Sequence, residues 1–429
     1  ASDTINPVGQ LSKEVIKNKS FDDFNNPLTQ DITSTYYKDD GSVISIDYKS
    51  NDFHKEDGSA GYDIYGRVTS MTTQTFKYDT DGTTKIIITT QIFNNSNFDE
   101  YGNAGFQTIT TYEGEAIDAN FSSIKTVENH YDDPIAKKRG NATGSISITY
   151  KDINKSIKLE ETDTVTDPKD FDNNGNPLKQ DQTSYRFDIN TQAKTQVSHT
   201  VITSVYDLRN DATSQNIKTY HVEIDANTNK EAETLISDQD FTNRSFDASH
   251  NVVNQMVISY AVDKDGNRVV FDVKEIRSTA FRASGVASQV ITATYSDASK
   301  TKIIGVEVVI NSDVTADGKI KEMTVTKYSG CNPLDPGAGD IITPTGKLSE
   351  EVIKNKSFDN FNNPLTQDIT STYYKDDGSV LSKEYKSNTL TYDVYNRTIG
   401  MIVRTFDSSE RTNPPVTTQI FANSDFDAY

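Results

Sequence analysis

Apolar and polar residues alternate one by one through many short stretches of the chain. Gln107–Tyr112 reads QTITTY, Gly144–Tyr150 reads GSISITY and Gln255–Tyr260 reads QMVISY. Successive side chains of a strand point to opposite faces, so this alternation predicts half-buried β-strands. Since no segment has a sustained helical period, the chain is expected to be all-β.

Two kinds of turn signal separate these strands. An aromatic–aspartate pair opens the first kind and is followed closely by Asn or Gly, as in Phe98–Asn103 (FDEYGN). The second kind contains Asp-Gly, a strong hairpin signal. It occurs at Lys38–Ser42, Asp79–Thr83 and Asp263–Asn267, with return strands at Val43–Tyr48, Lys85–Phe93 and Arg268–Ile276. We predict tandem antiparallel β-hairpin repeats, about ten in number, that form an elongated twisted ribbon or a β-solenoid with aromatic side chains along its core.

The aromatic–aspartate pair recurs along the whole chain. Its aromatic residues are Phe21, Tyr62, Phe98, Tyr131, Phe171, Tyr206, Phe246, Phe358, Tyr392 and Phe426. Most steps fall between 33 and 41 residues (131 − 98 = 33, 62 − 21 = 41). One hairpin of this length is the expected folding unit.

A second, much longer period is a duplication. Glu14–Ser45 recurs as Glu351–Ser382 with two differences, at an offset of 351 − 14 = 337 residues. Thr89–Tyr101 resembles Thr417–Tyr429 at an offset of 328, so the second copy is nine residues shorter, around Asn51–Gly66. We predict a first block over 1–330, a Pro/Gly linker over 331–346, and a truncated second copy over 347–429. Further copies are expected in the natural protein.

The composition limits the partners. Net charge is 43 − 63 = −20, which disfavours nucleic acid and anionic membrane surfaces. No apolar run of 18 residues is present, so no membrane span is predicted. The single cysteine, Cys331, excludes a disulfide within the chain and is expected to be a free thiol.

Tyr62–Thr72 (YDIYGRVTSMT) resembles the YD repeat of RHS and related bacterial surface and toxin-shell proteins. Phe98–Asn103 (FDEYGN) and Phe171–Asn176 (FDNNGN) are looser versions. The resemblance implies an all-β protein that is secreted or displayed on the cell surface. This chain departs from the family in its longer spacing, in Asn25 and Asn396 at the glycine position, and in showing no toxin domain.

No pattern of catalytic or metal-binding residues stands out. The five histidines (His54, His130, His199, His221 and His250) lack metal-ligand spacing, and no nucleophile or phosphate-loop motif occurs. Asp79–Gly82 and Asp263–Asn267 resemble the start of a calcium loop, but Thr90 and Lys274 stand where the final glutamate would be. We therefore predict no catalytic, cofactor-binding or metal residues and no cofactor. The sequons at Asn18 and Asn94 are expected to carry no glycan.

These features favour a structural repeat region of a long bacterial extracellular fibre or cell-surface adhesion stalk without catalysis. Its expected partners are other copies of itself or adjoining repeats, and surface glycans. Two alternatives stay open: a glycan- or protein-binding surface module, and a fragment of an RHS-type toxin shell.

Overall fold

The computed structural model describes residues 12–423, except 38–42, 79–83, 225–230, 248–249, 263–266, 283, 316–317, 335–339, 394–395 and 412–413. Its strands form one antiparallel sheet in which each pairs with the next along the chain. In the described part the two end strands do not pair with each other, so the sheet is open. The all-β prediction of tandem antiparallel hairpins is confirmed.

The first twelve strands are β1 (Ser12–Phe21), β2 (Pro27–Tyr37), β3 (Val43–Asp52), β4 (Ser70–Tyr78), β5 (Lys85–Phe98), β6 (Ala104–Glu113), β7 (Phe121–His130), β8 (Gly144–Tyr150), β9 (Lys158–Val165), β10 (Lys179–Phe187), β11 (Lys194–Tyr206) and β12 (Ala212–Ile224). The remaining strands are β13 (Glu231–Phe246), β14 (Val252–Val262), β15 (Arg268–Phe281), β16 (Ala287–Tyr295), β17 (Ile303–Val314), β18 (Ile320–Cys331), β19 (Pro344–Phe358), β20 (Pro364–Tyr374), β21 (Val380–Tyr392), β22 (Thr398–Phe406) and β23 (Thr417–Ala422). Within the described residues, helical structure is limited to α1 (Pro134–Lys138) and the 3₁₀ turns Asp118–Asn120 and Pro168–Asp170.

The two edges of the sheet carry different connections. The aromatic–aspartate turns lie along one edge, which we call the turn edge. The Asp-Gly hairpins belong to the opposite edge, the hairpin edge, although their loops at 38–42, 79–83 and 263–266 lie outside the described residues. The strands predicted from alternation are confirmed as β6, β8 and β14, and the predicted return strands are confirmed as β3, β5 and β15.

The sheet is a single layer with little packed core. Its accessible surface is 24121 Å², whereas a compact protein of this mass exposes roughly 16,000 Å². Both faces therefore meet solvent over most of their area, which agrees with the low hydrophobic content.

Aromatic side chains near the hairpin edge are the regular exception. Phe76, Tyr112, Tyr150 and Tyr295 are buried, each just after a β-bulge. A bulge adds a residue to one strand and increases the local twist. These rings are the aromatic core of the repeat.

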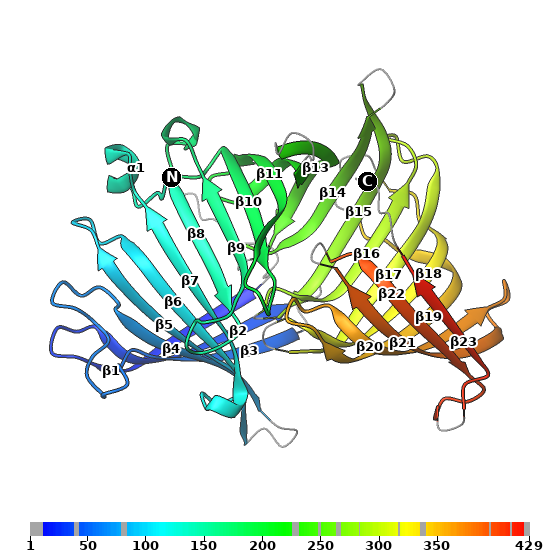
Figure 1. The fold of residues 1–429 in the computed structure, drawn as a ribbon, viewed down its shortest axis with the longest axis horizontal. Helices are drawn as coiled ribbons and strands as arrows, with labels where there is room; N and C mark the ends of the chain where they lie inside the picture. The colour runs from blue at the N-terminus through cyan, green and yellow to red at the C-terminus, as the bar shows by residue number, and fades with distance from the viewer. Residues whose placement is uncertain are drawn as a thin grey trace, which may run out of the picture.

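The sheet also coils, so that distant parts of the chain touch. It curves from the N-terminal strands on one side of the molecule, through β10–β15, to the C-terminal strands on the other (Figure 1). The Lys319 ammonium lies 3.7 Å from the Glu113 carboxylate, and the Arg186 guanidinium donates to Asn396 Oδ1. Glu113 ends β6 and Lys319 follows β17, while Arg186 is in β10 and Asn396 follows β21. Both contacts span eleven strands (17 − 6 and 21 − 10), which we call one winding.

The sheet continues across the segment predicted as a linker. β18 pairs directly with β19, Cys331 opposite Pro344. The loop between them folds back on the sheet, because Ile342 is buried in a cluster with Val273, Ala293, Tyr295 and Val306. The division into blocks remains a prediction about the duplication.

A buried ion cluster lies on the same face of β15 as this apolar group. Glu275 is fully buried, and its carboxylate accepts from Lys300 Nζ (2.7 Å) and Arg277 Nη1 (3.0 Å). Arg277 Nε also donates to the carbonyl of Asp340, at 2.9 Å. The cluster therefore joins β15 to the loop after β16 and to the loop after β18.

Lys300→Met should lower the free energy of unfolding by about 3 kcal/mol, because it leaves the buried Glu275 carboxylate without its ammonium partner. Urea unfolding monitored by circular dichroism measures the loss. The double variant Glu275→Leu/Lys300→Met should recover most of it. A loss below about 1 kcal/mol in Lys300→Met would contradict a charge-paired Glu275.

Candidate functional site

Each turn on the turn edge is built around the carboxylate of its aspartate. In the turn at Asp63, Oδ1 accepts the backbone N–H of Tyr65 (2.9 Å) and of Arg67 (3.0 Å), and Oδ2 accepts Arg67 Nε (2.6 Å). Gly66 has a positive φ of 75°, which reverses the chain. The same carboxylate contacts recur in the turns that begin at Asp22, Asp99, Asp172, Asp247, Asp359 and Asp393. The aromatic–aspartate motif is thus the signature of one turn geometry.

These contacts hold the carboxylates in their charged form. Desolvation raises the pKa of Asp63, but the hydrogen bonds from Arg67 and Tyr65 outweigh it, so the pKa lies below its usual value. Asp99 behaves in the same way, with Asn103 as the main hydrogen-bond donor. The aspartates of these turns are therefore negatively charged at neutral pH.

Neighbouring turns are also joined to one another. The residue four positions after the aspartate reaches the next turn: Arg67 Nη1 donates to the carbonyl of Asp99 (3.2 Å), and Asn103 Nδ2 donates to that of Lys137 (2.7 Å). The hydroxyls of Tyr62 and Tyr392, in matching positions of the two copies, donate to the carbonyls of Pro27 and Pro364. The turns consequently stack in a continuous row.

An asparagine three residues before the first turn residue, which is aromatic except at Val314, forms a second ladder, which sequence analysis missed. Its amide donates to a carbonyl of the preceding strand or the turn that leads into it: Asn95 to Val68, Asn243 to Ala212, Asn311 to Ala287, Asn355 to Ile320 and Asn423 to Thr398. Asn243 and Asn311 are only 5% exposed. The sequence signal was present in NKSFD, NRSFD and NSDFD, and it includes the sequon at Asn18. The sequons at Asn243 and Asn355 therefore contain a structural amide.

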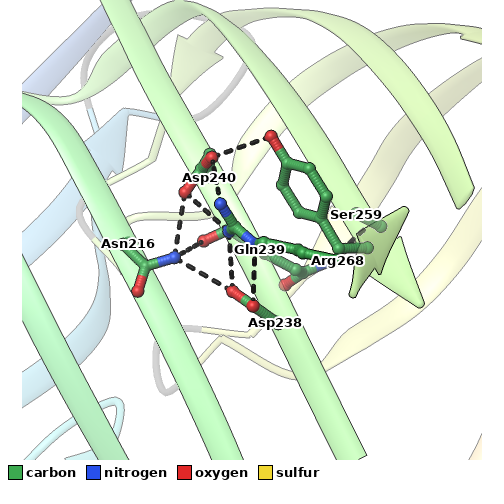
Figure 2. A network of polar contacts seen from close by, with 7 residues as sticks. Asn216, Asp238, Gln239, Asp240, Ser259 and Arg268 are labelled. Carbon is green, nitrogen blue, oxygen red and sulfur yellow. Dashed lines mark hydrogen bonds and ion pairs between the residues drawn. The ribbon is translucent and has the colours of Figure 1, made fainter. Parts of the chain in front are cut away.

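Figure 2 shows a polar cluster close to the hairpin edge, on β12 to β15. The Arg268 guanidinium binds both Asp238 (2.7 and 2.8 Å) and Asp240 (2.9 and 3.0 Å). Asn216 donates to both carboxylates and the Tyr260 hydroxyl to Asp240. Desolvation raises the pKa of Asp240, but hydrogen bonds from Arg268, Asn216 and Tyr260 lower it below the usual value. Because both carboxylates already accept hydrogen bonds from Arg268 and Asn216, the cluster fits a structural role better than acid–base chemistry.

An open groove of about 600 Å³ lies beside β3 and β4. It is lined by Asp52, His54, Lys55, Glu56, Asp57, Thr69, Ser70, Thr72, Ile92 and Asn94. His54 Nδ1 lies 2.5 Å from Asp52 Oδ1. Part of the lining comes from the segment around Asn51–Gly66 that is shorter in the second copy, so the second copy lacks that part. No aromatic side chain lines the groove on which a sugar ring could stack, and glycan binding stays a prediction.

The structure brings no metal site together from the histidines. Within the described residues, no three His, Cys, Asp or Glu side chains are placed to hold a metal ion. The two calcium-like turns at 79–82 and 263–267 lie largely outside the described ranges. Cys331 is a free thiol whose Sγ is 3.7 Å from the Tyr295 hydroxyl. No helix in the described part is both long enough and apolar enough to cross a membrane.

No protein-family model matches the chain, and no curated protein matches it. Among solved structures, one chain of a structure described as TcdB2-TccC3-Cdc42 is similar to it at 12% identity. The match covers 89% of this chain and 24% of that one, with a TM-score of 0.16. A score of this size does not establish a shared fold.

Asp359→Asn should lower the free energy of unfolding by about 1–2 kcal/mol, because an amide cannot accept both the backbone N–H groups and Asn363 Nδ2. The neighbouring change Asn360→Asp restores the residue of the first copy, Asp23, and should cost less than about 0.5 kcal/mol. Chemical unfolding of both variants tests the pair. Equal losses in the two would contradict the role of the turn carboxylate.

Arg268→Gln should lower the free energy of unfolding at pH 7 by about 2 kcal/mol, because it leaves Asp238 and Asp240 facing each other. In the wild type the pKa of Asp240 is depressed in the folded state, so its contribution is complete above the ordinary value of 3.8 and is lost as pH falls through the lowered value. The difference between wild type and variant should therefore shrink as pH falls from 5 to 3. Guanidinium unfolding across this range measures it, and a difference that does not change with pH would count against the assignment.

Proposed function

We propose that this chain is a structural segment of a long bacterial extracellular fibre or surface stalk, built from a coiled β-ribbon and without catalytic activity. The observation that carries the proposal is the contact between successive windings at Arg186. It supports a ribbon that stiffens itself by lying against its own previous winding.

Arg186 sits at the end of β10, a position that a flat ribbon would leave in water. Instead it is 9% exposed. Its guanidinium binds Glu160 at 3.2 Å, donates to Asn396, and lies 4.5 Å from the centre of the Phe361 ring. Asn396 and Phe361 belong to turns of the next winding, and a guanidinium on an aromatic face is a favourable contact once water is excluded. The hairpin edge of one winding thus packs on the turn edge of the next.

The size of the winding favours a fibre over a container. Eleven strands at a spacing of about 4.8 Å give a perimeter near 50 Å, before any strand tilt. Barrels of comparable strand number are filled by side chains or hold one small ligand, and open channels begin at about 16 strands. A closed barrel of this perimeter would be too narrow for a folded cargo domain.

The second candidate is a fragment of an RHS-type toxin shell. It is favoured by the Asp63–Arg67 turn, which matches the YD repeat residue for residue. Extracellular location rests on the same resemblance. The toxin-shell hypothesis requires windings with a larger perimeter than the one seen here, so that a cargo domain could be enclosed.

Arg186→Glu should separate the windings, because it places a second negative charge beside Glu160 and removes the donor to Asn396. Small-angle X-ray scattering should show a larger maximum dimension for this variant. Arg139→Glu, the same charge change on an exposed turn-edge residue, is the control and should leave the curve unchanged.

For the wild type, a radius of gyration near 22 Å, the value for a compact sphere of this length, would contradict a coiled ribbon.

A further inference from the structure

The turn edge of the first winding exposes a row of large apolar side chains. They stand one to three residues after the turn aspartate. The exposed fractions are 84% for Phe24, 87% for Ile64, 75% for Tyr65 and 97% for Leu208, and Tyr101 and Ile135 continue the row. We call these six residues the turn face. Contiguous exposed apolar residues of this kind mark an interaction surface.

The second winding contains a counterpart of Phe24 that is packed against another part of the chain. Phe361 is the counterpart of Phe24 in the duplication (361 − 24 = 337), yet it is half-buried against Arg186 of the previous winding. Of the second-winding turns, the one at Phe361 is described at this position, while residues 248–249, 316–317 and 394–395 lie outside the described part. Phe361 thus docks on a hairpin edge, whereas the described residues place no hairpin edge on the turn face of the first winding.

The hairpin edge of the second winding exposes the complementary row. Val262, Ile304, Ile341, Leu381 and Val416 belong to five successive hairpins and are 57% to 74% exposed. We call these five residues the hairpin face. The hairpin face has one residue at every second strand, about 10 Å apart, and the turn face has the same step except at the turn between β9 and β10, which contributes none.

We infer that the hairpin face of one copy of this chain binds the turn face of a second copy, head to tail. The contact would repeat between molecules the packing that the windings already make within one molecule. The inference rests on the proposed structural role and names the partner. The interface is heterologous, so its repetition gives an open filament and not a closed dimer. With a net charge of −20 on each copy, association should strengthen as salt screens the repulsion.

Sedimentation velocity of the full chain at about 50 µM should show a ladder of oligomers that grows between low and high salt. Phe24→Ser/Tyr65→Ser/Leu208→Ser removes the turn face, and Ile304→Ser/Ile341→Ser/Leu381→Ser removes the hairpin face. Each variant alone should associate at least about a hundredfold more weakly, because three exposed apolar anchors are lost. Ile117→Ser/Ile153→Ser, at hairpins of the first winding that are 52% and 48% exposed, should associate as the wild type does.

A mixture gives the decisive readout. Each variant keeps one intact face, so an equimolar mixture of the turn-face and hairpin-face variants should form a discrete heterodimer and nothing longer. No complex in the mixture, or a wild type that stays monomeric at high salt, would overturn the head-to-tail contact.

The scattering curve of the monomer separates this failure from failure of the structural role. If the particle is coiled but does not associate, the head-to-tail contact is wrong and the proposed structural role still stands. A compact sphere removes the role itself.

Discussion

The ribbon depends on a carboxylate that accepts the backbone N–H groups of its own turn. A meander of this length must reverse its chain at every strand, and each reversal leaves peptide groups without strand partners. The turn aspartate satisfies two of them, and an Asn or Gly with positive φ completes the reversal, as Asn362 does at 65°. Because the following residue, Asn363, donates from its side chain to Asn396 in the next turn, each turn positions its neighbour. Local hydrogen bonding is thereby converted into long-range order.

Coiling follows from what happens at the ends of the strands. At the turn edge, bulges accompany the buried asparagines, as beside Asn243 and Asn311. At the hairpin edge, a second set of bulges precedes buried aromatics such as Tyr112 and Tyr150. Every bulge adds right-handed twist to a sheet that has no second layer to flatten it. The sheet bends until its edges meet, and Arg186 becomes buried at that meeting.

The strands and turns were predictable because their signals are local: period-two alternation, Asp-Gly, and an aromatic before aspartate. The asparagine ladder was readable in principle, since the residue recurs three positions before the turn aromatic in NKSFD and NRSFD. The contacts of Arg186, in contrast, could not be predicted from the sequence. Its partner Asn396 lies 210 residues away, and the coil that joins them arises from the summed twist of eleven strands. No local pattern encodes that sum.

The two periods of the chain do not match, and this constrains the chemistry of the contacts. One winding takes 206 to 210 residues (319 − 113 and 396 − 186), while the duplication takes 337, about 1.6 windings. Equivalent turns of the two copies therefore do not stack on each other, and each packs on a hairpin from another part of the block. Phe361 lies on Arg186, and not above Phe24. Nearly identical turns must then be able to pack on unlike hairpins. Apolar side chains, an aromatic face and side-chain amides meet this demand, because each tolerates several partners. If each turn required one specific partner, the duplicated block would have to be a whole number of windings long.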